Sequence, residues 1–500
     1  MSAKRIKIFS GILALTAVFL ICAVLRISVF KNKTYSESVA SQRTESIAVK
    51  RYRGLFYDRN MLPLVDGTAK IYTVDENGDV TESGDGISVR TTERYGKGGL
   101  ASHLIGYVDS EGCGVSGLEK CFDKILQSDK AFKVNVITTA SGKVVEGAGA
   151  GFYDDDGKTA DSVRLTIDSH IQRIAESCLD NSGYDGAVVV MDVKNFDILA
   201  MASRPQYDRN KVSEHVYSQG SELVNRCISA YNAGSIFKII TSAAAIESET
   251  ADGVYNCSGF SDIEGRQFAC HLYSGHGEID FEKAFLNSCN CAFYQIGIKT
   301  GAQKIIDTAR SFGLGERLLC FDGLAEMTGN LPQKAEYGIH EAVNYSIGQG
   351  EILITPVQAA NMACIIANNG IANCVNVADA ITDYKGTVKR NLRESGERRV
   401  IGFETAQKIQ KCMRLAVTEG TASGAESDIV KIAGKTGTAQ TGWIENGENM
   451  VHGWFCGYFP YDNPKYAMAV LTENGRSGSE SAVPLFKEIA EEIIKFYPAG

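Results

Sequence analysis

The chain has 500 residues, which is longer than one ordinary domain and indicates two or three domains. Hydrophobic residues make up 44% of the chain and charged residues 22%, a composition typical of a globular protein with a large core. The net charge of −9 argues against a nucleic-acid partner, because such a partner favours a basic surface.

The N-terminus carries the clearest targeting signal. Residues 8–25 contain no charged residue, with three cations before them and Arg26 after them. This length is near the minimum for a membrane-spanning helix, about 17 residues, and no small-residue cleavage site of a signal peptide follows. Because basic residues favour the cytosolic side, we expect residues 1–7 to form a cytosolic tip, residues 8–30 a single transmembrane helix, and the remaining chain to lie outside the cell membrane.

Short strand and turn patterns follow the apolar segment and continue to about residue 135. Residues 140–160 are rich in Gly, Ala and Asp, which is typical of a boundary between domains. We therefore predict a stalk and a small non-catalytic domain over residues 31–150, followed by a second domain over residues 160–500.

The second domain is predicted to begin with a strand that ends at Asp168. Ser169 and Gln172 have the spacing of a capping box, so the following residues are expected to form a helix. Strands are then predicted at residues 186–193, 198–202, 430–440 and 466–473, and a closing amphipathic helix at residues 484–496. Helical patterns dominate from residue 222 to about residue 420, and a turn region lies between the strands predicted at 430–440 and 466–473. This order indicates an α+β fold with one antiparallel sheet.

A serine and a lysine stand at the start of a buried helical pattern, in Ser235-Ile236-Phe237-Lys238. A helix would place the Ser235 hydroxyl and the Lys238 amine on one face, because positions three residues apart are neighbours there. The helix N-terminus adds unpaired N–H groups where an oxyanion could form. Alone, the tetrad is weak evidence, because such a short motif also occurs by chance.

Two further motifs follow in order, Ser288-Cys289-Asn290 and Lys435-Thr436-Gly437-Thr438. A serine hydroxyl becomes a nucleophile when a base takes its proton, and Lys238 can be that base only if burial and nearby cations keep it partly neutral. We therefore predict that Lys435 lowers the basicity of Lys238. Ser288 would relay a proton to the leaving group, and Asn290 would hold both Lys238 and the substrate backbone.

The third motif suggests how a substrate is held. Thr436 and Thr438 can donate hydrogen bonds to a substrate carboxylate, and Gly437 lets a peptide approach the strand. The backbone N–H groups of Ser235 and Thr438 are candidates for an oxyanion hole. A phosphate-binding loop is excluded, because the glycine that it requires five positions before Gly434 is Ile429. Neither a Gly-x-Ser-x-Gly elbow nor a His-Glu-x-x-His motif occurs in the sequence.

A group of cysteines and histidines surrounds the second motif, at Cys257, Cys270, His271, His276, Cys289 and Cys291. A disulfide between Cys257 and Cys270 is compatible with a chain outside the cell. Reduced structural thiols and a zinc site remain open as alternatives. Because the spacing matches no tight pair of zinc ligands, the sequence assigns no metal ligand and no cofactor.

The three motifs in this order are the signature of penicillin-binding proteins and class A β-lactamases. Their context resembles that of a class B penicillin-binding protein, a membrane-anchored peptidoglycan D,D-transpeptidase, and the likeness covers nearly everything from residue 50 onward. It includes Arg53-Gly54, Asp58-Arg59-Asn60, Ser116-Gly117-Leu118-Glu119 and residues 200–205, 344–350, 355–358 and 454–460. The chain departs from the family at Ala233, usually Pro, and at Ile236, usually Thr.

The resemblance implies a penicillin-binding, serine β-lactamase-like transpeptidase domain, with an antiparallel sheet flanked by helices, preceded by a mixed pedestal domain and one transmembrane helix. Ser235 would attack the bond between two D-alanines of a peptidoglycan stem peptide and pass the acyl group to an amine. β-Lactams would acylate the same serine. The resemblance also implies a polytopic membrane glycan polymerase as partner, because the chain shows no glycosyltransferase motif before residue 160.

Three alternatives use or imitate the same site. A D,D-carboxypeptidase or β-lactamase would use water as acceptor, although a class A lactamase needs an additional acidic residue and no pedestal. A β-lactam sensor needs a cytosolic signalling domain, for which the residues before the span leave no room. A non-catalytic β-lactam-binding scaffold is disfavoured because each chemical residue is present. The sequence leaves open a role in elongation, division or sporulation.

Overall fold

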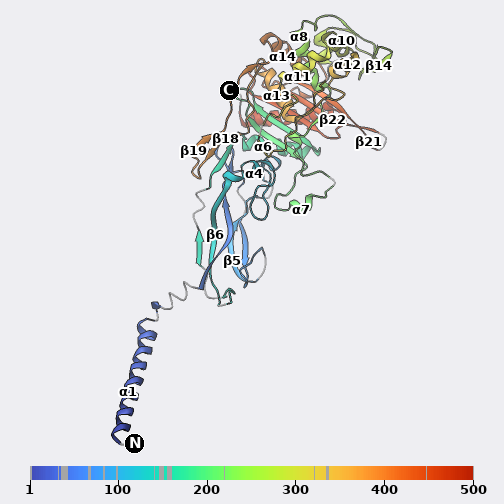
Figure 1. Ribbon diagram of the computed structural model, residues 1–500. Helices are drawn as coiled ribbons and strands as arrows, with labels where there is room; N and C mark the ends of the chain where they lie inside the picture. Colours follow the sequence, from blue (N-terminus) through green and yellow to red (C-terminus); the bar gives the residue numbers. More distant parts are fainter. Residues whose placement is uncertain are drawn as a thin grey trace. The chain divides into compact units, whose positions relative to one another are not determined.

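The computed structural model describes residues 3–31, 33–34, 43–65, 69–82, 85–96, 99–139, 141–145, 151–154, 160–218, 220–319, 321–333, 337–445 and 448–498 (Figure 1). The chain forms two compact units, each assembled from separate stretches of sequence. The first unit comprises residues 1–52, 68–93 and 128–159, and the second comprises residues 53–67, 94–127 and 160–500. The predicted domain boundary at residues 150–160 falls largely outside the described residues and stays a prediction.

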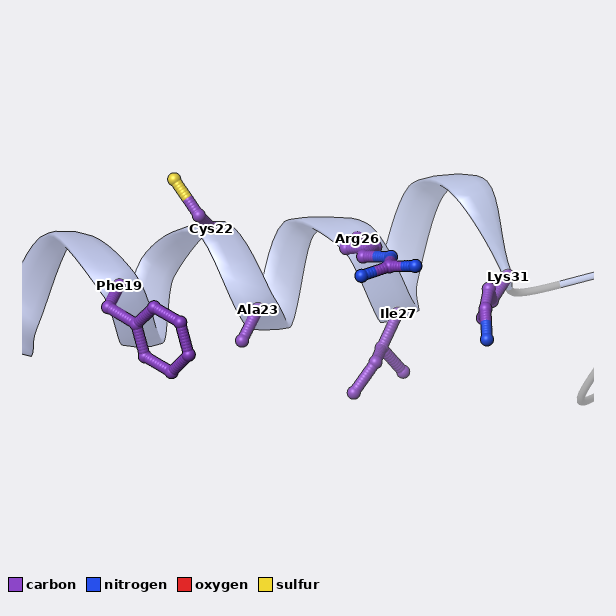
Figure 2. A pocket seen from close by; sticks show the side chains of 6 residues that line it. All are labelled: Phe19, Cys22, Ala23, Arg26, Ile27 and Lys31. Atoms are coloured by element: carbon purple, nitrogen blue, oxygen red, sulfur yellow. The ribbon is translucent and has the colours of Figure 1, made fainter.

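The first unit begins with an apolar helix, α1 (Ala3–Leu25), which continues as the π-helical turn η1 (Arg26–Phe30). Within Lys4–Val29, a window of 18 residues has a mean hydropathy of 2.7, and this stretch is long and apolar enough to cross a membrane. Figure 2 shows Phe19, Ala23 and Ile27 projecting to one side of this helix, as their spacing of four residues requires. The apolar side chains along α1 are exposed, so the protein itself does not cover them.

The first unit also contains two small sheets. One has the strand order β1-β6-β7 and the other β4-β3-β5. Their bounds are β1 (Thr44–Arg53), β3 (Ala69–Val74), β4 (Val80–Thr81), β5 (Ile87–Thr92), β6 (Gln127–Ile137) and β7 (Gly151–Asp154). Val74, Val89, Val134 and Val136 form a common hydrophobic cluster. These strands therefore share one core, and β-branched side chains suit such a surface.

The second unit is built on a five-stranded antiparallel sheet with the order β10-β9-β23-β22-β21. The strands are β9 (Gly186–Asp192), β10 (Ile198–Arg204), β21 (Ala433–Glu445), β22 (Glu448–Phe459) and β23 (Tyr466–Thr472). Its described helices are α3 (Ser102–Ile105), α4 (Gly117–Cys121), α5 (Asp123–Leu126), α6 (Ser169–Ser182), α7 (Val212–His215), α8 (Lys238–Glu247), α9 (Phe281–Leu286), α10 (Asn290–Thr300), α11 (Ala302–Ser311), α12 (Ile339–Ser346), α13 (Pro356–Ala367), α14 (Phe403–Thr418) and α15 (Val483–Phe496).

Shorter elements complete the second unit. They are the strands β2 (Phe56–Tyr57), β8 (Ser162–Leu165), β11 (Tyr231–Asn232), β12 (Tyr255–Cys257), β13 (Phe260–Ile263), β14 (Arg266–Ala269), β15 (Gly277–Ile279), β16 (Leu353–Ile354), β17 (Ile371–Ala372), β18 (Ala378–Thr382), β19 (Val388–Asn391) and β20 (Arg398–Arg399), and the turns η2 (Arg226–Ile228), η3 (Gly234–Phe237), η4 (Ser423–Ala425) and η5 (Gly478–Ala482). Strands β19, β18, β8 and β2 form a second sheet in that order.

The central sheet is buried on both faces, which explains the continuous apolar run of β9. Ala187 and Val189 pack into the hydrophobic cluster that contains α8 and α13, whereas Val188 and Val190 pack into the cluster that contains α6 and α15 (Figure 1). Side chains alternate along a strand, so helices cover each face. The predicted α+β fold, with helices flanking an antiparallel sheet, is thus confirmed.

Two local predictions were wrong. The region between the last two predicted strands is itself a strand, β22, and not a turn region. Its glycines obscured the pattern, and they are needed for packing: a Cβ at Gly457 would lie 2.3 Å from the Ala433 carbonyl oxygen, in the neighbouring strand. The helix α6 is capped by Asp168, whose side chain accepts hydrogen bonds from the N–H groups of His170 and Ile171, so Ser169 is not the cap.

Candidate active site

The first and third motifs lie against each other. The turn η3 contains Ser235 and leads directly into α8, while the third motif lies in β21, at the edge of the sheet. A Cβ at Gly437 would lie 3.2 Å from the backbone nitrogen of Ile236. A Cβ at Gly234, where φ is +55°, would lie 2.7 Å from the Thr438 carbonyl oxygen. Glycine at these two positions therefore allows the backbone of the turn to approach the edge strand.

Lys238 joins the first motif to the second. Its side chain is fully buried, and its Nζ donates hydrogen bonds to the Asn290 Oδ1 at 2.7 Å, to the Ser288 carbonyl oxygen at 2.7 Å and to the Ser288 Oγ at 3.2 Å. The same amine lies 5.2 Å from the ring centroid of Phe293. Three oxygen acceptors thus hold the amine in one position, three residues after Ser235 in the sequence.

Ser288 adopts an unusual backbone conformation. Its φ is +53°, in the left-handed region that residues with a side chain rarely occupy, and its side chain is buried. Such a conformation costs on the order of 1–3 kcal/mol and persists where the surroundings fix it. Here it connects α9 to α10 and turns the Ser288 carbonyl oxygen towards Lys238.

Both site lysines are buried, and burial changes their acidity. It lowers the pKa of the Lys238 amine to about 7, and nearby thiols only partly oppose this shift. Burial, followed by repulsion from Lys238, lowers the pKa of Lys435 well below its usual range. The sequence predicted that Lys435 would lower the basicity of Lys238, but burial is the first cause of the shift at Lys238.

The remaining groups of the third motif have defined partners. Lys435 Nζ donates a hydrogen bond to the Thr436 carbonyl oxygen at 3.2 Å, and its side chain is fully buried. The Thr438 Oγ1 accepts a hydrogen bond from the Gly478 N–H at 3.2 Å. The Thr436 and Thr421 hydroxyls are 3.0 Å apart. Thr421 and Gly478 were not identified from the sequence, because neither belongs to a motif with a recognisable spacing.

Ser235 is half-buried, and within the described part of the chain no group forms a hydrogen bond with its hydroxyl. It lies in the first turn of a helix, where the backbone N–H groups have no intrahelical partner. The Gly234 N–H donates to the Gly348 carbonyl oxygen at 3.0 Å, so the segment at residues 344–350 supports the turn. The hydroxyl that is proposed as nucleophile is therefore not engaged elsewhere.

The cysteine group near the second motif contains no disulfide between Cys257 and Cys270, one of the three states that the sequence left open. Cys257, Cys270, Cys289 and Cys291 are all free and buried. The sulfurs of Cys257, Cys270 and Cys289 lie close to a ring nitrogen of His276. None of these side chains accepts a hydrogen bond from Lys238 in the described part of the chain. The reduced-thiol and zinc alternatives both remain.

Comparisons with known proteins agree with this geometry. The family profile described as "Penicillin binding protein transpeptidase domain" matches residues 186–491, more than half of the chain. The chain is 30% identical over 429 residues to Stage V sporulation protein D of Bacillus subtilis, across 82% of this chain and 64% of that relative. It is 30% identical over 385 residues to peptidoglycan D,D-transpeptidase PbpA of Mycobacterium tuberculosis, across 70% of this chain and 76% of that relative.

A solved structure shows the same fold. Penicillin-binding protein 3 of Mycobacterium tuberculosis, complexed with aztreonam, aligns with a TM-score of 0.70 at 25% identity, covering 91% of this chain and 97% of that one. Fold and motifs together define the class of penicillin-binding transpeptidases. The chain belongs to the penicillin-binding protein transpeptidase family. It spans 64% of the length of its Bacillus subtilis relative.

Proposed function

We propose that this chain is a serine D,D-transpeptidase that cross-links peptidoglycan stem peptides through an acyl-enzyme on Ser235. The observation that carries the proposal is the buried contact of Lys238 with Ser288 and Asn290, one helical turn from Ser235 and beside the edge strand β21. Relatives named as peptidoglycan D,D-transpeptidases support the choice of reaction.

In the first step, the Ser235 Oγ attacks the carbonyl carbon between the two terminal D-alanines, and neutral Lys238 takes the hydroxyl proton. The Ser235 and Thr438 N–H groups would stabilise the oxyanion. The C–N bond then breaks, and the terminal D-alanine leaves with a proton delivered through Ser288. Lys435 is proposed to act on this relay through its electrostatic coupling to Lys238. The product is an ester between Ser235 and the shortened stem peptide.

In the second step, the amine of a neighbouring stem peptide attacks this ester. An amide bond forms, the ester C–O bond breaks, and the proton returns to Ser235. Thr436 and Thr438 are proposed to hold the substrate carboxylate, with Gly437 leaving room for the peptide along β21. A β-lactam would acylate Ser235 by the same first step, with its ring amide opening in place of the peptide bond. No resident cofactor is needed for either step.

The apolar helix α1 supports a single-pass membrane anchor, with the catalytic unit outside the membrane. A transpeptidase of this kind needs nascent glycan strands as substrate, and this chain shows no glycosyltransferase motif. We therefore propose a polytopic membrane glycan polymerase as its partner.

Labelling with a fluorescent penicillin tests the site. The full-length chain in detergent is expected to retain the label through denaturing electrophoresis, whereas the Ser235→Ala variant is expected to remain unlabelled. A matched control is Ser242→Ala, which changes a buried serine in α8, one turn after Lys238. Equal labelling of the wild type and Ser235→Ala would contradict the assignment of the nucleophile.

A further inference from the structure

Four side chains converge beside the second motif and have a donor set typical of structural zinc sites. They are Cys257, Cys270, His276 and Cys289, and their ligand atoms all lie within 4.8 Å of one another. The three cysteines are buried and free. Three thiols and one imidazole match the Cys3His set that holds tetrahedral zinc in structural sites.

The separations between the ligand atoms agree with a metal and not with a disulfide. The Cys257 Sγ and Cys270 Sγ lie 3.5 Å and 3.7 Å from the His276 Nδ1, and the Cys270 and Cys289 sulfurs are 4.0 Å apart. Zn–S bonds of about 2.3 Å and Zn–N bonds of about 2.0–2.1 Å place tetrahedral ligand atoms about 3.5–3.8 Å apart. A disulfide would require sulfurs separated by about 2.05 Å.

The backbone brings these ligands together independently of the side chains. Cys257 ends β12 and pairs with Gly277, the residue after His276. The Cys270 N–H donates to the Gly259 carbonyl oxygen at 2.8 Å, which fixes the end of β14 against the same turn. At Gly275, where φ is +78°, a Cβ would lie 2.3 Å from the Cys257 carbonyl oxygen. The paired strands β12 and β15, with the hairpin of β13 and β14 between them in the sequence, thus present three of the ligands.

The fourth ligand connects this cluster to the active site. Cys289 stands between Ser288 and Asn290, the residues that accept hydrogen bonds from Lys238. Its sulfur also accepts a hydrogen bond from the Ala292 N–H at 3.5 Å and caps α10. A metal bound to this sulfur would restrain both the helix start and the left-handed backbone at Ser288.

We propose that Cys257, Cys270, His276 and Cys289 bind one zinc ion, and that this ion positions Ser288 and Asn290 around Lys238. The three thiols bind as thiolates, so zinc binding releases their protons to solvent. The positioning role rests on the proposed function, whereas the metal site itself does not. Bound zinc would also prevent the thiols from pairing as disulfides outside the cell.

Metal analysis of the full-length chain, purified in detergent without added chelator, tests the site. We expect about one zinc per chain, and after exchange with Co(II) the visible bands of a tetrahedral ion with thiolate-to-metal charge transfer. This spectrum requires no variant, so it stays informative if a ligand substitution prevents folding. Absence of zinc together with no Co(II) spectrum in the reduced protein would overturn the site.

Neighbouring residues provide matched controls. His276→Ala is expected to lose the zinc, whereas His271→Ala is expected to retain it, because His271 is outside the ligand group. Likewise, Cys257→Ser should lose zinc and Cys374→Ser, a half-buried free cysteine elsewhere, should not. Equal zinc content in His276→Ala and His271→Ala would contradict the ligand assignment.

The positioning role has its own readout. Removing zinc from the wild type should lower the rate constant of penicillin acylation by about 10- to 100-fold, as loss of a supporting shell commonly does, and adding zinc back should restore it. Unchanged acylation of the zinc-free protein would overturn the positioning role and leave the metal site in place. Zinc-loaded protein that is never acylated would instead contradict the proposed function, with the metal site still supported.

Discussion

Lys238 is the residue on which the proposed chemistry depends. An amine that is protonated at neutral pH cannot act as a base. The three oxygen acceptors around Lys238 would by themselves stabilise the protonated form. Burial lowers the pKa of Lys238 to about 7, so a substantial fraction of the amine is neutral under physiological conditions. The hydrogen bonds to Ser288 and Asn290 fix its position without adding a negatively charged partner.

The pH dependence of acylation follows from this pKa. The neutral amine is the reactive form, so the rate constant for penicillin acylation should rise with pH, with a midpoint near 7, and level off above about pH 8. Stopped-flow measurement between pH 5.5 and 9 checks this. A rate that falls as pH rises through 7 would exclude neutral Lys238 as the base.

Replacing the amine should remove both the rate and its pH dependence. Lys238→Met is expected to lower the acylation rate constant by about 100- to 10,000-fold, the usual contribution of a general base. Lys304→Met changes an exposed lysine on α11 and should leave the rate unchanged. A Lys238→Met variant that is folded by circular dichroism and still acylated at the wild-type rate would contradict the role of Lys238.

At the scale of elements, the site depends on how closely the turn η3 approaches the edge strand β21. Two glycines, Gly234 and Gly437, make this approach possible: a Cβ at Gly234 would collide with the Thr438 carbonyl oxygen, and a Cβ at Gly437 would press on Ile236 and Trp454. Gly437 does not need a left-handed conformation, so a substitution there tests the approach without straining the strand itself.

Gly437→Ala should therefore weaken catalysis more than stability. The added Cβ would lie 3.0–3.2 Å from Ile236 and Trp454 atoms, and a shift of a few tenths of an ångström would displace Ser235 from the third motif. We expect the acylation rate constant to fall about tenfold or more, since a misplacement of about 1 Å can cost about 100-fold. Gly151→Ala, in the first unit, is the control, because its Cβ would make only an ordinary contact, 3.7 Å from the Asn135 Cβ. Unaltered acylation by Gly437→Ala would show that the close approach is not needed.

The elements also show what the sequence could predict. The hairpin of β9 and β10 and the helix α15 were predicted because their apolar patterns are regular and both lie in well-packed surroundings. Strand β22 was missed because its glycines serve contacts with neighbouring strands that a local pattern cannot reveal. The cap of α6 was misplaced by one residue, since Asp168 and Ser169 both favour that position.

The site was predictable in its motifs but not in its surroundings. Spacing alone placed Ser235 and Lys238 on one helical turn. It could not show that Lys238 contacts Ser288 and Asn290, because those contacts cross a long stretch of sequence. The convergence of Cys257 and His276 was hidden for the same reason: the pairing of β12 with β15, and not a tight local spacing, brings the ligands together.

At the scale of the whole molecule, a buried ionic cluster joins distant segments of the second unit. Glu119 is fully buried and pairs with Arg53 and Arg94, while Tyr95 donates a hydrogen bond to it. Burial, together with repulsion from Glu119, raises the pKa of Tyr95, so its hydroxyl stays protonated. The segments that resemble the family's pedestal motifs thus meet at one carboxylate.

Removing this carboxylate should destabilise the second unit. Glu119→Ala removes the carboxylate that two buried guanidinium groups share, and only Arg53 keeps a second carboxylate partner, Asp123, among the described ion pairs. Breaking a buried ion pair by removing one partner typically costs about 3–5 kcal/mol of unfolding free energy. Urea unfolding followed by tryptophan fluorescence measures it. Glu214→Ala removes an exposed pair with Lys211 and should change stability by less than about 1 kcal/mol. Equal unfolding midpoints for the two variants would show that the cluster adds nothing to stability.

The measurement that tests the central claim most directly is intact-mass spectrometry of the full-length chain with a stem pentapeptide and an amine acceptor. The account predicts a transient adduct on the peptide that contains Ser235, equal in mass to the substrate without its terminal D-alanine. It also predicts an amide product that joins donor and acceptor. Release of only the hydrolysed tetrapeptide, at every acceptor concentration, would contradict transpeptidation and identify a carboxypeptidase.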